Sequence, residues 1–178
     1  RARGVATAHL VSPSVWAWRA GRMRRIKRAV DLMLCLFPFE VPMYADAGLK
    51  AVCVGHPLLD TLAEKRTGGS DRDPTLVALL PGSRSKEIRA IFPIMLDAAV
   101  HLRMSRQRLR FEAAAASESL AAEMRAALAD RGKDDSFCPI VVGSAHSLMQ
   151  RAGAGMVCSG TATLEATYFG LPMVILYK

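Results

Sequence analysis

The sequence predicts an α/β protein built on doubly wound parallel sheets, and three observations support this prediction. From residue 74 onward, apolar runs of strand length alternate with amphipathic stretches, as they do when helices cover a parallel sheet. Residues 1–60 contain a shorter series of the same kind. The polar stretch "AEKRTGGSDRDP" separates the two series. We therefore expect the last part of one domain at 1–57, a hinge or linker at 58–74, and most of a second domain at 75–178.

The second series contains the more regular elements. Strands are predicted near 75–80, 110–116, 139–142, 154–158 and 173–177, and helices near 86–103, 118–131, 145–152 and 161–169. Pro93 is expected to kink or restart the first of these helices, because proline removes a helical hydrogen bond. The stretch "FEAAAAS" is assigned as a strand from its place in the alternation, against the helix propensity of alanine.

The first series is shorter and has the appearance of the end of a domain. It predicts a strand near 6–11, a basic helix, a strand at Leu32–Phe37, a turn at 38–40 and a strand at Ala51–Val54. No internal repeat is visible in the sequence. The sheet of the first domain is therefore expected to be only partly present.

The composition is that of a globular protein, with 51% hydrophobic and 22% charged residues among 178. A membrane span needs about eighteen consecutive apolar residues, and no such run occurs, nor does the start contain the apolar core of a signal peptide. We therefore expect a cytoplasmic protein. The four cysteines lie far apart without C-x-x-C spacing and are expected to be reduced, mostly buried thiols. The chain begins at an arginine and ends just after a strand-like run, so we expect an internal fragment.

Most of the formal net charge of +8 lies near the start of the chain, where residues 1–40 hold eight Arg or Lys against Asp31 and Glu40. The cationic residues of the predicted basic helix, "RMRRIKR", are Arg22, Arg24, Arg25, Lys27 and Arg28. A solvated helix face would explain them. Attraction to anionic lipid headgroups is the functional alternative, at about 1 kcal/mol per cation. Nucleic acid is disfavoured, because no recognised binding motif accompanies the charge.

The stretch "ALLPGSRSKEI" (78–88) forms the first of two turns that point to chemistry. A buried strand leads through Pro-Gly into a helix, which directs backbone N–H groups and the positive end of the helix dipole toward one spot. Gly82 lets the backbone approach a ligand, Ser83 can donate a hydrogen bond, and Arg84 offers a planar fork suited to phosphate. The turn matches neither a Walker A loop nor G-x-G-x-x-G, and a tight corner with a surface arginine is the alternative.

The second turn lies in "MVCSGTATLEATYFGLPMVIL", where Ser159, Gly160 and Thr161 join a strand to a helix that ends at Gly170 and Pro172. Glu165, one turn into this helix, could accept hydrogen bonds from two ribose hydroxyls. Alternatively, it only complements the helix dipole. Two such turns on strands of one sheet suggest a nucleoside diphosphate bound across the edge of the sheet.

Metal sites are not supported by the sequence. Asp71-Arg72-Asp73 has the D-x-D form found in metal-dependent glycosyltransferases, but it precedes a strand, where such a motif would follow one. The four histidines show no ligand spacing. We expect neither a metal nor a cofactor.

Several blocks together resemble the lipid-A-disaccharide synthase family of glycosyltransferases. They are "SPSVWAWR" (12–19), "PFE" (38–40), "VGHPLLD" (54–60), "LLPGSRSKEI" (79–88), "SGTATLEA" (159–166) and "PMVILYK" (172–178). The first block, and "GHPLLD" joined to "LLPGSR", are highly specific. "SGTATLE" is shared more widely among transferases of the GT-B fold.

The resemblance implies two Rossmann-like GT-B domains, the first on the acceptor side and the second binding a uridine diphosphate sugar. UDP-2,3-diacylglucosamine would donate its sugar to 2,3-diacylglucosamine 1-phosphate, with inversion, release of UDP and no required metal. On this basis Gly82, Ser83, Arg84, Ser159, Gly160, Thr161 and Glu165 are the expected UDP-binding residues. The catalytic base of the family is expected before Arg1, so no catalytic residue is assigned and the fragment is expected to be inactive.

The acylated substrates imply work at a membrane surface. Trp16, Trp18 and the basic helix are therefore expected to dock on the anionic inner membrane of a Gram-negative bacterium, from the cytoplasmic side. A homodimer of the full-length protein is a further implication of the family resemblance.

Two classes of alternative stay open. The first is another GT-B enzyme, of the peptidoglycan N-acetylglucosaminyl transferase or UDP-N-acetylglucosamine 2-epimerase type, against which "SPSVWAWR" argues. The second is a non-catalytic basic module that docks on membranes. Such a module would need neither Arg84 nor Glu165, so titration with UDP separates it from an enzyme.

Overall fold

The computed structural model describes residues 4–13, 15, 21–67 and 71–177. Trp16 and Trp18 lie outside these residues. The chain divides into two compact units, Arg1–Thr61 and Leu62–Lys178, and the division falls inside the segment predicted as a linker. No helix in the described part of the chain is long and apolar enough to cross a membrane.

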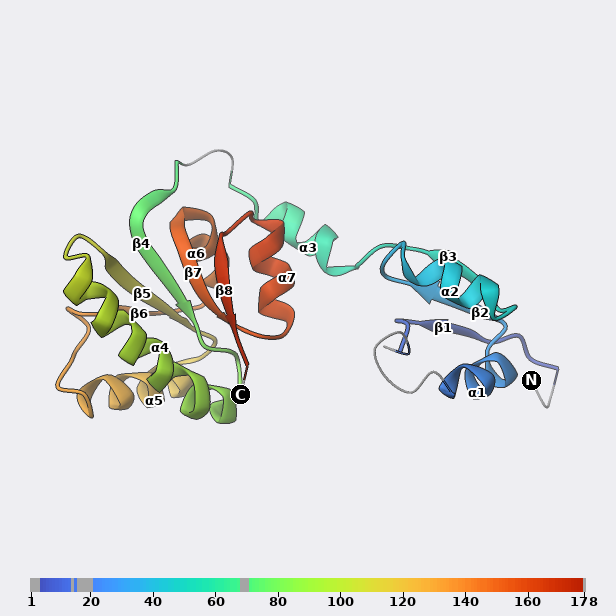
Figure 1. Ribbon diagram of the computed structural model, residues 1–178, viewed down its shortest axis with the longest axis horizontal. Helices are drawn as coiled ribbons and strands as arrows, with labels where there is room; N and C mark the ends of the chain where they lie inside the picture. The colour runs from blue at the N-terminus through green and yellow to red at the C-terminus, as the bar shows by residue number, and fades with distance from the viewer. Residues whose placement is uncertain (1–3, 14, 16–20, 68–70, 178) are drawn as a thin grey trace. The chain divides into compact units, whose positions relative to one another are not determined.

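The first unit is a small parallel sheet with two helices (Figure 1). Its strands are β1 (Ala8–Leu10), β2 (Leu32–Cys35) and β3 (Lys50–Cys53), in that order across the sheet, and its helices are α1 (Arg22–Ala29) and α2 (Glu40–Asp46). Met33, Cys35 and Tyr44 are fully buried at the centre of its core.

The predicted turn at 38–40 is present at 38–39, and it leads into helix α2, which was not predicted. The Glu40 carboxylate accepts hydrogen bonds from the N–H groups of Leu36 and Phe37 at 3.2 and 3.1 Å, which closes the chain into the start of a helix. Pro42 lies in the first turn, where proline is tolerated. The sequence analysis treated Pro38 as a turn signal and gave these contacts no weight.

The second unit is a five-stranded parallel sheet with helices on both faces (Figure 1). Its strands are β4 (Asp73–Leu80), β5 (Arg110–Ala115), β6 (Ile140–Val142), β7 (Ala152–Cys158) and β8 (Met173–Leu176), and the helices between them are α4 (Ser85–Ser105), α5 (Glu118–Ala129), α6 (Ala145–Arg151) and α7 (Thr161–Tyr168). All five predicted strands and four predicted helices are confirmed within a few residues, including the alanine-rich β5.

The strand order, β6-β5-β4-β7-β8, places β4 beside β7 although two other strands separate them in the chain. Strands β5 and β6 extend the sheet on one side of β4, and β7 and β8 extend it on the other. Their carboxyl ends are in register, with Leu80 opposite Val157. In doubly wound sheets, ligands bind where the order reverses, outside the carboxyl ends of the strands. The two turns singled out in the sequence therefore follow neighbouring strands at this reversal point.

The central strands of this sheet, β4, β5 and β7, are mostly buried on both faces. Val77 and Leu79 of β4 pack in the core that includes Phe92 of α4 and Met124 of α5. Leu76, Ala78 and Leu80, which alternate with them, are also buried. Helices α6 and α7 contact the strands on the opposite face from α4 and α5 (Figure 1). Burial on two faces explains why these strands appear as continuous apolar runs.

Helix α4 runs from Ser85 to Ser105 as one helix with Pro93 inside it. Of the two predicted effects of Pro93, a kink or a restart, the structure contradicts the restart. The apolar side of α4 is buried on both sides of the proline, at Ile88, Ile91, Phe92, Met95, Leu96 and Ala99. This packing outweighs the loss of one helical hydrogen bond.

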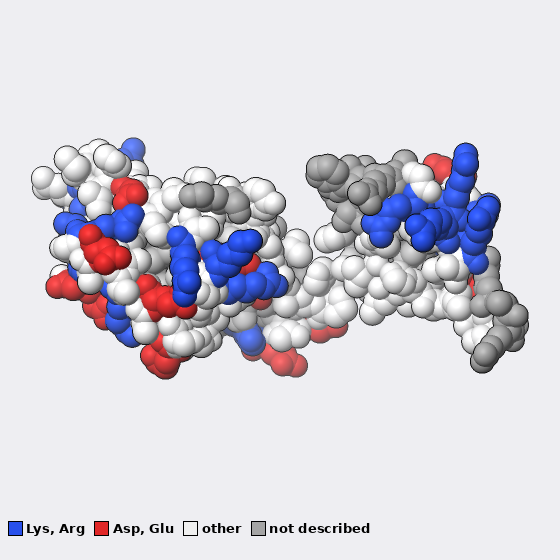
Figure 2. Space-filling view, turned by 90° about the horizontal axis from the view of Figure 1, so that it is seen from below, with Lys and Arg blue, Asp and Glu red and all other residues white. Residues whose placement is uncertain are grey.

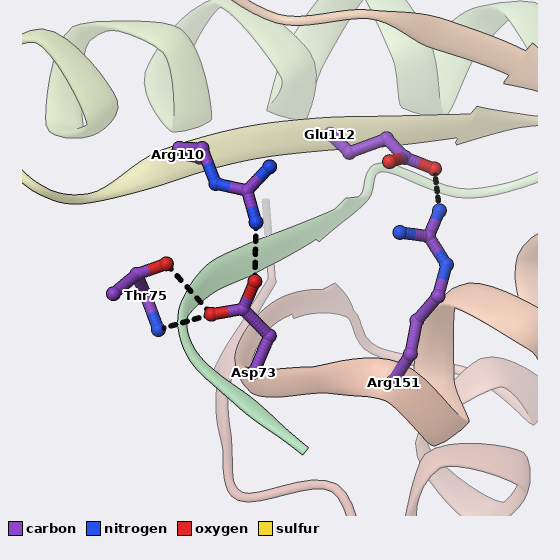
Figure 3. Close-up of polar contacts among 5 residues, drawn as sticks. All are labelled: Asp73, Thr75, Arg110, Glu112 and Arg151. Atoms are coloured by element: carbon purple, nitrogen blue, oxygen red, sulfur yellow. Dashed lines mark hydrogen bonds and ion pairs between the residues drawn. The ribbon is translucent and has the colours of Figure 1, made fainter. Parts of the chain in front are cut away.

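The amino-terminal end of the sheet is held by ion pairs (Figure 3). Asp73, at the start of β4, accepts hydrogen bonds from the backbone N–H and the hydroxyl of Thr75 and forms an ion pair with Arg110. The hydrogen bonds from Thr75, and then Arg110, hold the pKa of Asp73 below its usual range. Glu112 of β5 pairs with Arg151 of α6 nearby. Asp73 thus has structural partners at the end of β4 opposite the Pro-Gly turn.

Helix α3 (Leu58–Glu64) lies in the segment predicted as a linker. Leu62 is fully buried, and the residues after the helix are attached to α6. The side-chain amide of Gln150 donates to the Lys65 carbonyl at 3.1 Å, and its oxygen accepts the Thr67 N–H at 2.8 Å. The described residues after α3 therefore belong structurally to the second unit.

Candidate nucleotide-binding site

A pocket of about 700 Å³ opens at the carboxyl edge of the second sheet, and every residue that lines it belongs to the unit Leu62–Lys178. Its volume is within the usual range for small-molecule sites, about 300–1,000 Å³. All seven residues predicted to bind UDP line it: Gly82, Ser83, Arg84, Ser159, Gly160, Thr161 and Glu165. The ends of β5 and β6 contribute small residues, including Ala115 and Gly143. The fold thus brings both turns to one cavity.

The N-terminus of α7 forms one side of the pocket. Gly160 precedes the helix with φ +147°, a backbone conformation that favours glycine. No described side chain caps this helix, and its first turn contains no acidic residue. The N–H groups of a first turn have no partner within their own helix, so those at Thr161 and Ala162 are suited to an anion. The Ser159 N–H, by contrast, donates to the Leu176 carbonyl at 2.8 Å and is committed to the sheet.

The N-terminus of α4, on the other side, differs from the sequence prediction. The Glu87 carboxylate turns back into the Pro-Gly-Ser-Arg turn, where Oε2 accepts hydrogen bonds from the N–H groups of Ser83 at 3.0 Å and Arg84 at 3.3 Å. Burial raises the pKa of Glu87, but these two N–H groups and the Arg84 guanidinium outweigh it and lower the pKa overall. The N–H groups that were expected to face a ligand are therefore already bound.

Arg84 is the most exposed polar group of this turn, with 79% of its side chain accessible. Its Nη1 donates to Glu87 Oε1 at 2.7 Å. A guanidinium has five N–H donors, so one contact with a carboxylate leaves others available for phosphate. The prediction of an arginine facing the anion site agrees with its place in the pocket lining.

His146 was missed by the sequence analysis and lies beside Glu165. Its Nε2 is 3.3 Å from Glu165 Oε1, and its ring packs against Phe169 with centroids 5.6 Å apart. Both His146 and Glu165 line the pocket and are largely buried. The histidines show no metal-ligand spacing in the sequence, and a pair formed by α6 and α7 has no local sequence signature.

Two further lining residues come from unexpected places. Lys65, just after α3, brings a cation to the pocket from the segment predicted as a linker. Cys158 ends β7 at the pocket and is buried, and its burial followed by the nearby Glu87 raises the pKa of its thiol. The pocket therefore combines two cationic side chains, two carboxylates, a histidine and the uncapped N-termini of α6 and α7.

Parallel α/β sheets, with an anion-suited pocket at the point where the strand order reverses, place the chain in the GT-B class of glycosyltransferase folds. This confirms the predicted fold class. A family model described as lipid-A-disaccharide synthetase matches residues 1–178, and the chain belongs to that family. The resemblance drawn from the sequence blocks is thereby confirmed.

Relatives named lipid-A-disaccharide synthase match essentially the whole chain. The protein of Thiobacillus denitrificans is 45% identical over 98% of the chain, and that of Paraburkholderia phytofirmans is 43% identical over all of it. A Pseudomonas aeruginosa protein is 38% identical over the same extent. The matches cover 48%, 47% and 48% of these relatives, so the chain spans about half their length.

Proposed function

We propose that the chain is the nucleotide-binding part, with the end of the acceptor-side domain, of a glycosyltransferase of lipid A biosynthesis. The reaction transfers 2,3-diacylglucosamine from its UDP derivative to 2,3-diacylglucosamine 1-phosphate and yields the disaccharide 1-phosphate and UDP. Membership of the lipid-A-disaccharide synthetase family supports this reaction over those of other GT-B enzymes. The observation that carries the nucleotide assignment is the meeting of seven predicted residues in one pocket.

The proposed chemistry requires stabilisation of the leaving diphosphate. The 6-hydroxyl oxygen of the acceptor attacks the anomeric carbon, the bond from that carbon to the β-phosphate oxygen breaks, and UDP departs with the electron pair. Attack from the opposite face inverts the anomeric centre. In this chain, Arg84 and the N-terminus of α7 are the groups placed to stabilise the negative charge that develops on UDP. We assign the base that takes the hydroxyl proton to no residue of this chain.

Glu165→Ala in the full-length protein is expected to weaken UDP binding by at least tenfold with little change in stability. The substitution would remove the carboxylate that accepts hydrogen bonds from two ribose hydroxyls. A hydrogen bond to a charged group contributes about 1.5–3 kcal/mol. Calorimetric titration with UDP measures the affinity, and urea denaturation measures the stability.

Glu118→Ala is the matched control, because Glu118 lies in the first turn of α5 and does not line the pocket. An unchanged UDP affinity for Glu165→Ala would show that Glu165 does not bind the ribose and only complements the helix dipole. Failure of the unmodified protein to bind UDP would instead favour the non-catalytic module.

We also propose that α1 docks on the anionic inner-membrane surface from the cytoplasmic side. Figure 2 shows Lys and Arg side chains gathered on one face of the first unit, and α1, none of whose described residues is buried, carries five of them. Met23 and Ile26 of α1 pack against the core of that unit, which leaves the cationic side of the helix outward. A homodimer of the full-length protein is a further proposal, which light scattering tests.

Reversing two charges of α1, as Arg24→Glu with Arg25→Glu, is expected to lower binding to vesicles containing phosphatidylglycerol by at least tenfold, at about 1 kcal/mol per cation. Cosedimentation measures the binding, and vesicles of phosphatidylcholine alone provide the baseline. Arg103→Glu with Arg106→Glu, at the end of α4, is the control of equal charge. Equal losses of vesicle binding in both double variants would show that α1 is only a solvated helix face and does not dock on the membrane.

A further inference from the structure

The Pro-Gly-Ser-Arg turn before α4 and the Ser-Gly-Thr turn before α7 resemble each other in the sequence. They differ in the structure, because Glu87 occupies only the first. At the start of α4, the Glu87 carboxylate occupies the N–H groups of Ser83 and Arg84 and contacts the Arg84 guanidinium. At the start of α7, no described side chain takes the corresponding position. The turn at the start of α4 therefore already holds an anion, whereas the start of α7 does not.

The packing around Gly82 shows that the turn has a space that fits the Glu87 carboxylate. Gly82 adopts φ +114°, and a Cβ added to it would lie 2.3 Å from Glu87 Oε2 and 2.9 Å from Glu87 Cβ. The sequence analysis explained Gly82 by close approach of a ligand. The structure gives another reason, because any side chain at this position would collide with Glu87.

An anion that approached the start of α4 would meet this carboxylate. The two N–H groups have an acceptor already, and the negative charge of Glu87 offsets the positive end of the helix dipole. Like charges repel, so a phosphate at this point would have to displace Glu87 from three hydrogen bonds. At α7 a phosphate meets N–H groups without such competition.

We propose that Glu87 is a positioning residue for the leaving diphosphate, which it directs to the N-terminus of α7 and to the Arg84 guanidinium. It closes the N–H groups of Ser83 and Arg84, in the turn before α4, to phosphate and holds one edge of Arg84, so that the remaining donors of the guanidinium face the pocket. This inference rests on the proposed function, because it takes UDP as the occupant of the pocket.

Amide NMR of the full-length protein during titration with UDP tests the binding position. The resonances of Thr161 and Ala162 are expected to shift strongly, and those of Ser83 and Arg84 only weakly, because the latter N–H groups stay on Glu87. Shifts of Ser83 and Arg84 as large as those at α7 would show that the diphosphate displaces Glu87, and the inference would be wrong. If UDP produced no shift anywhere, the proposed function itself would fail.

Two substitutions separate the roles of the carboxylate. Glu87→Ala frees the two N–H groups and is expected to create a site for inorganic phosphate, seen as weaker UDP binding in phosphate buffer than in chloride of equal ionic strength. Glu87→Gln keeps an oxygen that accepts the same N–H groups but lacks the charge that orients Arg84. It is expected to resemble the unmodified protein toward phosphate and to lower kcat about tenfold with little change in the KM of the donor.

Glu123→Ala is the matched control for both variants. Glu123 of α5 also binds the first turns of α4, through the Ser85 hydroxyl at 2.8 Å and Arg89 at 3.0 Å, but it does not line the pocket. It is expected to change neither phosphate competition nor kcat. The same phosphate sensitivity in Glu123→Ala and Glu87→Ala, or an unaltered kcat in Glu87→Gln, would contradict the inference.

Discussion

Replacing Arg84 by alanine in the full-length protein is expected to lower kcat/KM about 100- to 1,000-fold, as removal of one preorganised electrostatic contact does in other enzymes. Arg84 is the cation of the Pro-Gly-Ser-Arg turn and lines the pocket. In the reaction proposed above, which requires no metal, few groups are available to stabilise the charge on the departing UDP. Steady-state kinetics with the diacylated donor and acceptor measures the effect.

The fold should tolerate this change. The ion pair between Arg84 and Glu87 is exposed, and exposed pairs contribute about 1 kcal/mol or less. Arg89→Ala is the control, because Arg89 lies on the same helix, is 75% exposed and forms an ion pair with Glu123 outside the pocket. A value of kcat/KM within about threefold of the unmodified enzyme would show that Arg84 does not stabilise the departing UDP.

Arg72→Ala is expected to lower the free energy of unfolding of the second unit by about 2–4 kcal/mol. The guanidinium of Arg72 donates through Nη1 to the carbonyls of Met149 and Ala152, both at 2.7 Å, and through Nη2 to the carbonyl of Phe169. It joins the end of α6, the start of β7 and the residue that follows α7. Its removal would leave three partly buried carbonyls without this donor, and urea denaturation measures the cost.

Arg103→Ala is the control for this prediction. Arg103 also donates to a backbone carbonyl, that of Leu109 at 2.9 Å, but the contact is single and exposed. The expected loss is below about 1 kcal/mol, because water replaces the arginine. Equal effects of the two substitutions would show that Arg72 does not join these elements.

Local sequence was sufficient for much of the second unit, because its central strands are mostly buried on two faces and most of its helices have one apolar side. The alternation even identified β5, whose alanines favour a helix by propensity. The same local signals missed α2 and α3. Helix α2 begins with a carboxylate that caps the turn before it, and α3 has only seven residues and runs directly into the polar stretch. The pattern of apolar residues predicts which segments are buried, but it does not predict capping contacts.

The sequence by itself determined the elements of the second unit, the family, and seven of the residues that line the candidate site. Only the tertiary structure decided that β4 and β7 are neighbours, that His146 meets Glu165, and that Glu87 fills the turn beside Arg84. Periodicity records which face of an element is buried, because burial acts on each residue separately. Strand order and side-chain pairing depend on contacts between segments far apart in the chain, and on which of several available donors a carboxylate reaches, so they are fixed only when the helices pack on the sheet.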